Sequence, residues 1–439
     1  MERTRLQSRG LSRVVTRVMS MSRVIWIVPL FVLIASCGDT DRSSFVPESV
    51  DTEQEFSSIE SFVADYWRRP IPPQGPAPEG WVGIEASLDP EACGSCHTAK
   101  LEDWSTTLHA GAYSPGLSGQ LVNWEESAPG TVRGCLACHA PLSEQSAWRE
   151  AADGSLESNP TFEPGLRDHG ITCAACHVRG HQRFGPLPRG GESALSAEGA
   201  PHGGVTRTAF FSDARFCSGC HQFEAPAPNG KSIQNTYEEW RASSWATEGV
   251  TCQDCHMPDR RHLWRGIHDP EMVRSALTIT WIGLERDSAR SESAADPAAR
   301  AIGLEILNSG AGHHFPTYVT PEVIVEISLL DDSGAPVPDH SNEWRIARKV
   351  ENRGGNWIEL SDTRIAAGEE VLFLLEGTSN AAKVRATIRV LPDAVYRDLF
   401  AGFLVGALSD SSRVLLTEAM NRASQSPFVL YDETMSIRR

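Results

Sequence analysis

One short pattern, Cys-x-x-Cys-His, occurs five times between residues 93 and 256, and it restricts the possible folds of this chain more than any other feature. At this spacing two sulfurs can bond to a porphyrin while the histidine binds its iron from one face, which is the attachment signature of c-type haem. The copies, numbered motifs 1 to 5 in chain order, use ten of the 11 cysteines. They consist of Cys93, Cys96 and His97; Cys135, Cys138 and His139; Cys173, Cys176 and His177; Cys217, Cys220 and His221; and Cys252, Cys255 and His256.

Other uses of paired cysteines explain this pattern less well. A redox-active Cys-x-x-Cys needs no histidine after it. Zinc sites would leave five histidines in the same position without a reason, and a disulfide framework would not impose this local order. We therefore predict five covalently bound haem c groups, each with iron.

The first 36 residues have the composition of an export signal. Six arginines precede a short apolar run, Val24–Ala35, which ends at Ser36-Cys37. A basic region, an apolar region too short to span a membrane comfortably and a small residue before the cut are typical of secretory signals. We predict that residues 1–36 form a signal peptide and that the mature chain lies outside the cytoplasm.

Cys37, the eleventh cysteine, follows a sequence that resembles a bacterial lipobox, Ile34-Ala35-Ser36-Cys37. This resemblance implies that Cys37 carries lipid and anchors the protein to a membrane, on the periplasmic or outer-membrane face. An ordinary signal peptide with an unrelated cysteine is the alternative. Residues 37–65 are polar and acidic and are predicted to form a flexible tether.

The charge of the chain limits its partners. The net charge is −17, and it becomes −22 once residues 1–36, with six Arg and one Glu, are removed. Such an acidic chain repels nucleic acid and anionic lipid. We expect redox protein partners instead, a donor on the membrane side and an outer acceptor. The oligomeric state stays open.

The residue pattern changes near residue 276, and this predicts two domains with a mixed fold. Residues 66–275 should form a pentahaem cytochrome c domain of short helices and loops, because its haem region, about Pro90 to Asp269, has only about 36 residues per haem, too few for separate cores. It should begin with a proline-rich extended strap over residues 66–76. Residues 276–439 should form an antiparallel β-sandwich-like domain, because apolar residues alternate there between turn signals.

The individual elements predicted from apolar periodicity are as follows. The helices are Thr98–Ala112, Asn235–Trp245, Pro392–Leu404 and Val414–Ala423, with a further helix start at Asp269-Pro270-Glu271. The strands are Leu277–Leu284, Ala301–Leu307, Val323–Leu330, Ile358–Leu360, Val371–Leu375 and Val384–Val390, with an exposed loop at Ser288–Ala299.

Each iron can take a second axial ligand, and histidine is the best candidate. Nine histidines lie outside the motifs, whereas methionine is scarce, so we expect two histidines on most irons and lower potentials than a His/Met pair would give. His109 should lie on the helix of Trp104, His181 should serve a neighbouring haem, and His202 precedes two glycines. Candidates also come from the pairs His262 and His268, and His313 and His314. We treat His169 and His340 as ordinary surface or hydrogen-bonding histidines.

Several segments resemble the superfamily of tetrahaem cytochrome c from ammonia oxidisers and hydroxylamine oxidoreductase. The resemblance implies closely stacked haem pairs, mostly with two histidines on each iron, and His109 as a distal ligand. Thr107 stands where that pattern has serine. The chain has five motifs instead of the eight of hydroxylamine oxidoreductase, and it lacks the Cys-x-x-Cys-Lys of pentahaem nitrite reductase. The segments are Trp104–Ala110, Gly170–Cys173, His221–Phe223, Gln234–Trp240, Gly249–Pro258 and Gly312–Thr317.

These observations favour an electron carrier over an enzyme. Five haems in one small body can pass electrons without chemistry on a substrate, and all five irons should then be bound from both sides. The alternative is a reductase or oxidase of a small nitrogen or sulfur compound, with one open iron and a proton donor such as His169, Tyr113 or Arg179. A third hypothesis is a module of a larger complex, docked through the β-rich domain.

Overall fold

A computed structural model describes residues 59–189, 200–223, 232–284, 301–354, 356–378 and 380–437. The chain divides into two units, residues 1–33 and 34–439, and all described residues belong to the second. The predicted signal peptide, Cys37, most of the tether and the Ser288–Ala299 loop lie outside the described residues, so these predictions remain untested.

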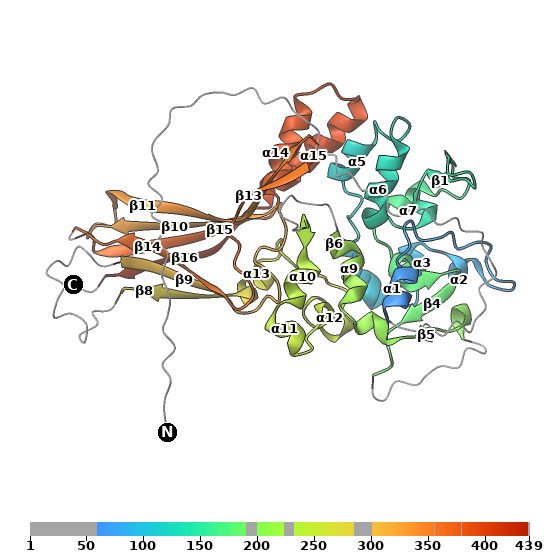
Figure 1. The fold of residues 1–439 in the computed structure, drawn as a ribbon, viewed down its shortest axis with the longest axis horizontal. Coiled ribbons are helices and arrows are strands. Elements are labelled where there is room, and N and C mark those ends of the chain that lie inside the picture. Colours follow the sequence, from blue (N-terminus) through green and yellow to red (C-terminus); the bar gives the residue numbers. More distant parts are fainter. Residues whose placement is uncertain are drawn as a thin grey trace. The chain divides into compact units, whose positions relative to one another are not determined.

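Up to residue 276 the chain forms short helices and very short strands, as predicted (Figure 1). Motifs 2 to 5 each end a helix at their histidine, whereas in motif 1 the helix ends at Gly94. The helices are α1 (Ile59–Tyr66), α2 (Gly83–Ala86), α3 (Pro90–Gly94), α4 (Thr98–Ser105), α5 (Pro115–Leu121), α6 (Pro129–His139), α7 (Pro164–Asp168), α8 (Cys173–His177), α9 (Arg215–His221), α10 (Thr236–Arg241), α11 (Ser244–Thr247), α12 (Cys252–His256) and α13 (Pro270–Ala276). The strands are β1 (Trp148–Glu150), β2 (Leu156–Ser158), β3 (Val178–Arg179), β4 (Gln182–Gly185), β5 (Thr206–Arg207), β6 (Gln222–Phe223) and β7 (Gln234–Asn235). The 3-10 turns are η1 (Ser143–Gln145), η2 (Pro201–Gly203), η3 (Ala209–Ser212) and η4 (Pro258–Arg260).

Polar side chains fix several helix starts. The Asp269 side chain accepts from the backbone N–H groups of Glu271 and Met272, and Pro270 occupies the first helical position of α13. This cap uses N–H groups that the helix itself leaves without a partner. The helix start predicted at Asp269-Pro270 is confirmed.

Two predicted helices are wrong in length. The helix expected over Thr98–Ala112 ends at Ser105, because the Thr106 and Thr107 hydroxyls donate to the carbonyls of Asp103 at 2.8 Å and Trp104 at 2.7 Å. Such bonds compete with the helix and turn the chain, so His109 lies in a turn. The helix expected over Asn235–Trp245 is instead two short helices, α10 and α11.

After residue 276 the chain forms antiparallel sheets. All six predicted strands are present, and β11, β12 and β16 are additional. The sheet orders are β11-β10-β15-β16, β14-β9-β8 and β12-β13. The strands are β8 (Leu277–Ile282), β9 (Ala301–Asn308), β10 (Glu322–Leu330), β11 (Pro336–Ile346), β12 (Arg348–Arg353), β13 (Asn356–Asp362), β14 (Glu370–Glu376), β15 (Lys383–Leu391) and β16 (Phe428–Ser436).

The two larger sheets share one apolar core. Along β10 the side chains of Val323, Val325, Ile327 and Leu329 are fully buried, which is the period of two expected for a strand with one inward face. They pack in one cluster with apolar side chains of β9, β14 and β15. This arrangement matches the predicted sandwich-like fold in outline.

Between β15 and β16 the chain forms a helical hairpin, α14 (Ala394–Leu404) and α15 (Asp410–Gln425), in agreement with the prediction of helices there. Helix α15 packs against α5, and the Ser412 hydroxyl donates to the Gly119 carbonyl at 2.5 Å. In the part of the chain that the structure describes, no helix combines the length and apolar character that crossing a membrane requires.

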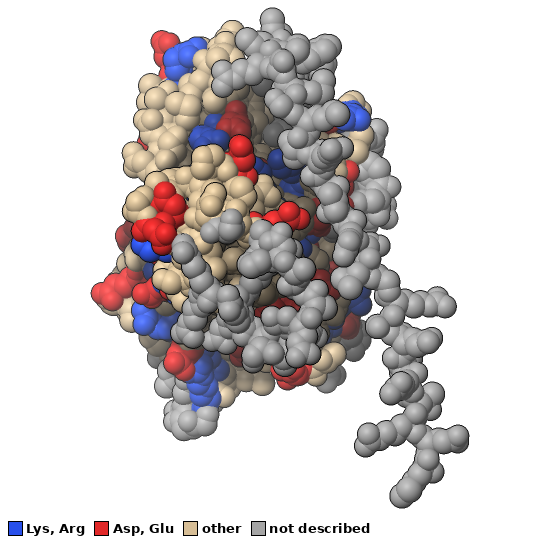
Figure 2. Space-filling model, turned by 90° about the vertical axis from the view of Figure 1, so that its left-hand side faces the viewer, with Lys and Arg blue, Asp and Glu red and all other residues tan. Residues whose placement is uncertain are grey.

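Charges of both signs are interspersed on the face that Figure 2 shows. On the four-stranded sheet, Arg385 pairs with Asp432 at 2.7 Å and Arg389 with Glu343 at 3.5 Å. Exposed ion pairs of this kind add little stability. The described surface of this face has no continuous basic area of the sort that nucleic acid would require.

Candidate haem-binding site

Backbone carbonyls orient three of the five motif histidines, whereas the Nδ1 of His221 lies 3.1 Å from the Gln234 side-chain amide. The Nδ1 atoms of His139, His177 and His256 lie 2.9, 2.8 and 2.7 Å from the carbonyl oxygens of Ala112, Phe184 and Arg265, respectively. A carbonyl only accepts, so Nδ1 carries the hydrogen in each ring. The Nε2 lone pair is then free for a metal, which is how metal-binding histidines are usually held.

Burial keeps these rings uncharged. It lowers the pKa of His109 to about 3, and the pKa values of His221 and His262 to about 4, with nearby histidines lowering them further. The pKa values of His177, His256 and His313 are also lowered, chiefly by burial. At neutral pH these side chains are therefore in the form that binds iron.

Three motif histidines face a second histidine at one characteristic spacing. The ring centres are 6.2 Å apart for His221 and His109, 6.1 Å for His177 and His262, and 6.3 Å for His256 and His313. Two imidazoles that bind one metal ion through nitrogen, at about 2.0–2.1 Å each, have ring centres about 6 Å apart. The three separations therefore fit one iron between each pair of rings.

His202 lies near the histidine of motif 1. After burial, the charge of His202 is the next largest cause that lowers the pKa of His97. The Nδ1 of His202 bonds to the Gly204 carbonyl at 3.0 Å, so its Nε2 is also free. His202 has a positive φ of 46° and is followed by Gly203 and Gly204 with φ of 70° and 81°, so this loop depends on glycine to turn as it does.

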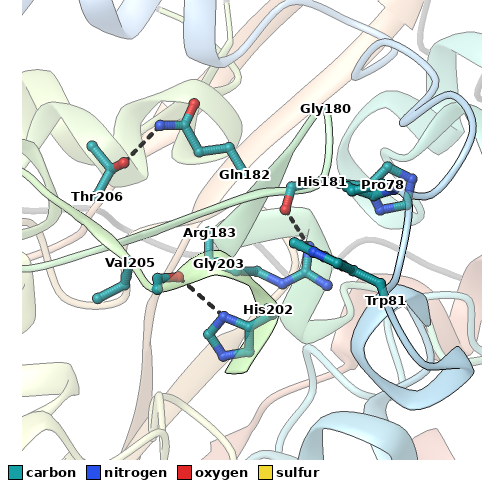
Figure 3. Close-up of a pocket in the computed structure, with 11 residues that line it drawn as sticks. Pro78, Trp81, Gly180, His181, Gln182, Arg183, His202, Gly203, Val205 and Thr206 are labelled. Atoms are coloured by element: carbon teal, nitrogen blue, oxygen red, sulfur yellow. Dashed lines mark hydrogen bonds between the residues drawn. The ribbon is translucent and has the colours of Figure 1, made fainter. Parts of the chain in front are cut away.

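The His202 loop lines a cavity of about 350 Å³ (Figure 3). Trp81, His181 and Arg183 line the same cavity, and Arg183 donates to the His181 carbonyl at 3.0 Å. The His181 side chain is buried, and its Nε2 donates to the Gly75 carbonyl at 3.1 Å. This leaves Nδ1, and not Nε2, without a partner, the reverse of the arrangement at His139, His177 and His256.

Among the described residues His139 of motif 2, like His97 of motif 1, has no histidine in ring contact, although the charge of His139 helps to lower the pKa of His221 of motif 4. All 14 histidines lie in the described residues, and none of the other 13 is found in ring contact with His139. The histidines outside the four pairs have other neighbours. His169 lies 3.7 Å from Asp89 and 3.6 Å from Glu91, His268 lies 3.0 Å from Asp393, His314 lies 3.6 Å from Glu239, and His340 Nδ1 lies 2.7 Å from the Pro338 carbonyl.

The predicted distal ligands thus fall into two groups. His109, His262 and His313 each face a motif histidine with ring centres 6.1 to 6.3 Å apart, and the charge of His202 acts on His97 of a fourth motif. The structure places none of His181, His268 and His314 beside a motif histidine, so their role as iron ligands stays a prediction that the geometry does not favour. Sequence spacing could not separate the groups, because His109 and His221 meet only through the fold.

The attachment cysteines meet in pairs. Hydrogen bonds join Cys93 to Cys173, Cys138 to Cys220, and Cys217 to Cys252. These contacts link motif 1 to motif 3, motif 2 to motif 4, and motif 4 to motif 5. The described cysteines form no disulfide, although several thiols are close enough to touch.

This arrangement fits haem c and does not fit zinc. Among the described residues, the group with three potential ligand atoms within 4.8 Å of one another is Asp89, Glu91 and His169, and it contains no motif residue. A structural zinc site would need four such atoms around one point. Paired neutral imidazoles with separate thiols are instead the donor set of a covalently attached, axially ligated haem.

Comparison with known proteins agrees with this conclusion. Residues 92–178 match the family described as cytochrome c554 and c-prime. A curated cytochrome c-552 of Aliarcobacter butzleri (strain RM4018) is 25% identical over 173 residues, which are 37% of this chain and 34% of the relative. The chain thus matches about a third of that relative's length.

A penta-heme cytochrome c552 from Thermochromatium tepidum has a similar fold. Its crystal structure gives a TM-score of 0.53 at 19% identity and covers 81% of this chain and 100% of that chain. Together the matches support a multihaem c-type cytochrome, as the sequence predicted. The superfamily of hydroxylamine oxidoreductase stays a prediction.

Proposed function

We propose that this chain is an extracytoplasmic pentahaem cytochrome that relays electrons between redox partners. When bound, haem iron supplies a one-electron couple. The observation that carries the proposal is the separation of 6.1 to 6.3 Å in three histidine pairs. Residues that fill both axial positions of an iron leave no place for a substrate, so such sites suit electron transfer.

The proposal assigns four pairs of axial ligands, one for each of motifs 1, 3, 4 and 5. Backbone carbonyls fix the orientation of several of these rings, as at His262, whose Nδ1 bonds to the Arg260 carbonyl at 3.0 Å. Second-shell bonds of this kind also make the ligands more basic. The pairs are His97 with His202, His177 with His262, His221 with His109, and His256 with His313.

Motif 4 is the proposed branching point of the relay. Its Cys220 touches Cys138 of motif 2, and its Cys217 touches Cys252 of motif 5. The charge of Cys176 of motif 3 also raises the pKa of the Cys217 thiol. Electrons that enter at one end would therefore have two exits.

Location and partners are proposed from the sequence alone. Residues 1–36 would direct export, and lipid on Cys37 would hold the protein at the periplasmic or outer-membrane face. Residues 37–65 would form a flexible tether between the lipid and the folded part of the chain. The strongly negative charge favours partners with a basic docking surface. We propose a membrane-side donor and an outer acceptor.

A second candidate function follows from His139, which faces no other histidine among the described residues. An iron at motif 2 with an open position could reduce or oxidise a small nitrogen or sulfur compound. Of the three predicted proton donors, Tyr113 packs against the same apolar cluster as Cys135 of motif 2. Arg179 is instead held against the Tyr66 ring at 3.8 Å, and His169 lies between two carboxylates.

One experiment separates these functions. Intact-mass analysis of protein matured in a haem-loading host should show five added haems; fewer would refute the proposal. Carbon monoxide should bind to none of the reduced haems in a pure relay. Binding to one fifth of the haem, together with turnover of nitrite, hydroxylamine or tetrathionate by dye-reduced protein, would establish the second function.

A further inference from the structure

Arg69 joins the attachment cysteines of two motifs. Its Nη1 lies 3.1 Å from Cys138 Sγ in motif 2, and its Nη2 lies 3.7 Å from Cys220 Sγ in motif 4. The guanidinium is planar and presents its donors as a fork, so it can serve two sulfurs at once, whereas a lysine ammonium is a single point charge. One permanent positive charge thus lies at the contact between two haem-attachment sites.

The main chain around Arg69 is fixed on both sides. On one side the Tyr66 hydroxyl donates to the Cys176 carbonyl of motif 3 at 2.8 Å. On the other side Ile71 N–H donates to the Pro141 carbonyl at 2.8 Å, and Ser143 N–H donates to the Ile71 carbonyl at 3.1 Å. Ile71 is also fully buried. The strap, residues 66–76, therefore places Arg69 by contacts with motif 3 and with the segment that follows motif 2.

The motif 4 sequence leaves space for this side chain. A Cβ atom at Gly219 would lie 3.2 Å from Arg69 Nη2 and 3.3 Å from the Trp67 ring, closer than most real contacts. Among the described residues Arg69 forms no ion pair with a carboxylate, whereas its neighbour Arg68 pairs with Asp65. The charge of Arg69 is therefore not neutralised by the protein.

We propose that Arg69 is a positioning residue that raises the reduction potentials of the two haems attached at motifs 2 and 4. The inference rests on the proposed function, because it requires haem at both motifs. Reduction adds one electron to a ferric iron and gives ferrous iron, without any bond change at Arg69. A nearby fixed cation favours this more negative state, and Arg69 acts on both haems because it contacts both attachment sulfurs.

The expected effect is moderate. Arg69 is solvent-exposed, so water weakens its field. We expect Arg69→Gln to lower the ratio of reduced to oxidised haem at a fixed potential about tenfold for two haems, which is about 59 mV for a one-electron couple. The other three haems should keep their potentials.

The test is a spectroelectrochemical titration of the full-length holoprotein. Arg68→Gln is the matched control, because it removes an adjacent arginine that is paired with Asp65, and it should leave all five transitions in place. Arg69→Lys keeps the charge and should restore most of the shift. Gly219→Ala should displace the guanidinium from Cys220 and lower mainly the reduction potential of one haem. This variant tests the proposal even if Arg69→Gln does not mature.

The outcomes are distinct. Two lowered transitions in Arg69→Gln, with none in Arg68→Gln, support the proposal. Five unchanged transitions, an equal shift of all five, or a shift in Arg69→Lys as large as in Arg69→Gln would overturn it. If the glutamine variant does not mature, unchanged potentials in Gly219→Ala overturn it equally. Wild-type protein with fewer than five haems would instead refute the proposed function.

Discussion

Replacing His109 by alanine should open the iron at motif 4 and no other. The ring centres of His109 and His221 are 6.2 Å apart, which fits an iron bound from both sides. His109 is fixed from behind, since its carbonyl accepts the Ile171 N–H at 3.0 Å, and a Cβ on Gly170 would lie 2.8 Å from the same carbonyl. The backbone on which the His109 ring is carried is therefore fixed by close contacts with Ile171 and Gly170.

The size of the effect follows from the number of motifs. Under the proposed function the five motifs hold five haems, so the variant should bring one fifth of the haem into a five-coordinate, high-spin form that binds carbon monoxide when reduced. If the iron of motif 2 is already open in the wild type, the bound fraction should rise from one fifth to two fifths. The difference between the two proteins is one fifth in either case.

The assay is carbon monoxide difference spectroscopy of the reduced protein, scaled to total haem. His340→Ala is the control, because His340 lies on β11 with its Nδ1 2.7 Å from the Pro338 carbonyl and has no motif residue as a partner. It should bind no more carbon monoxide than the wild type. An equal bound fraction in His109→Ala and wild type would show that His109 is not an iron ligand and would refute the argument from ring spacing.

Three further predictions test other parts of the molecule. Hydrogen bonds from Arg261 lower the pKa of Asp103 to about 2. The stabilisation that the ionised Asp103 gives the fold should therefore be complete above about pH 4 and be lost as the pH falls to 2. In thermal unfolding, Asp103→Asn should be less stable than wild type at pH 7 and equal to it near pH 2. Gly119→Val should lower the free energy of unfolding in denaturant by about 1–3 kcal/mol, because a Cβ there would lie 2.9 Å from Leu416 Cγ on α15. Cys37→Ser should move the protein from the membrane fraction to the soluble fraction on cell fractionation.

The sequence predicted the strands whose inward face is apolar and missed those whose faces are mixed. Strand β10 has a fully buried apolar residue at every second position from Val323 to Leu329, so period-two reasoning found it. Strand β11 pairs with β10 over its length, yet most of its residues are exposed. Its position is determined by backbone hydrogen bonds to a neighbour, which leave no apolar pattern in the sequence.

The candidate site was predictable in its covalent part alone. Spacing identifies the Cys-x-x-Cys-His motifs because all their atoms come from five consecutive residues. The pairing of His262 with His177 depends instead on Asp103, whose carboxylate accepts from the His262 N–H at 2.9 Å and from the Arg261 guanidinium at 2.8 Å. No local pattern connects these residues, so chain order could not choose between His262 and His268.

The sheet region also contributes to the proposed haem site. His313, which faces His256 of motif 5, is carried by a loop that leads into β10. Behind this loop the buried carboxylate of Glu239 on α10 forms an ion pair with the buried Arg364 at 2.8 Å and accepts from the Thr317 hydroxyl at 3.1 Å. Breaking a buried ion pair by removing one partner typically costs about 3–5 kcal/mol. A residue of the motif region and a residue of the sheet region therefore hold the His313 loop together, and the boundary predicted at residue 276 separates two folding patterns without separating two functions.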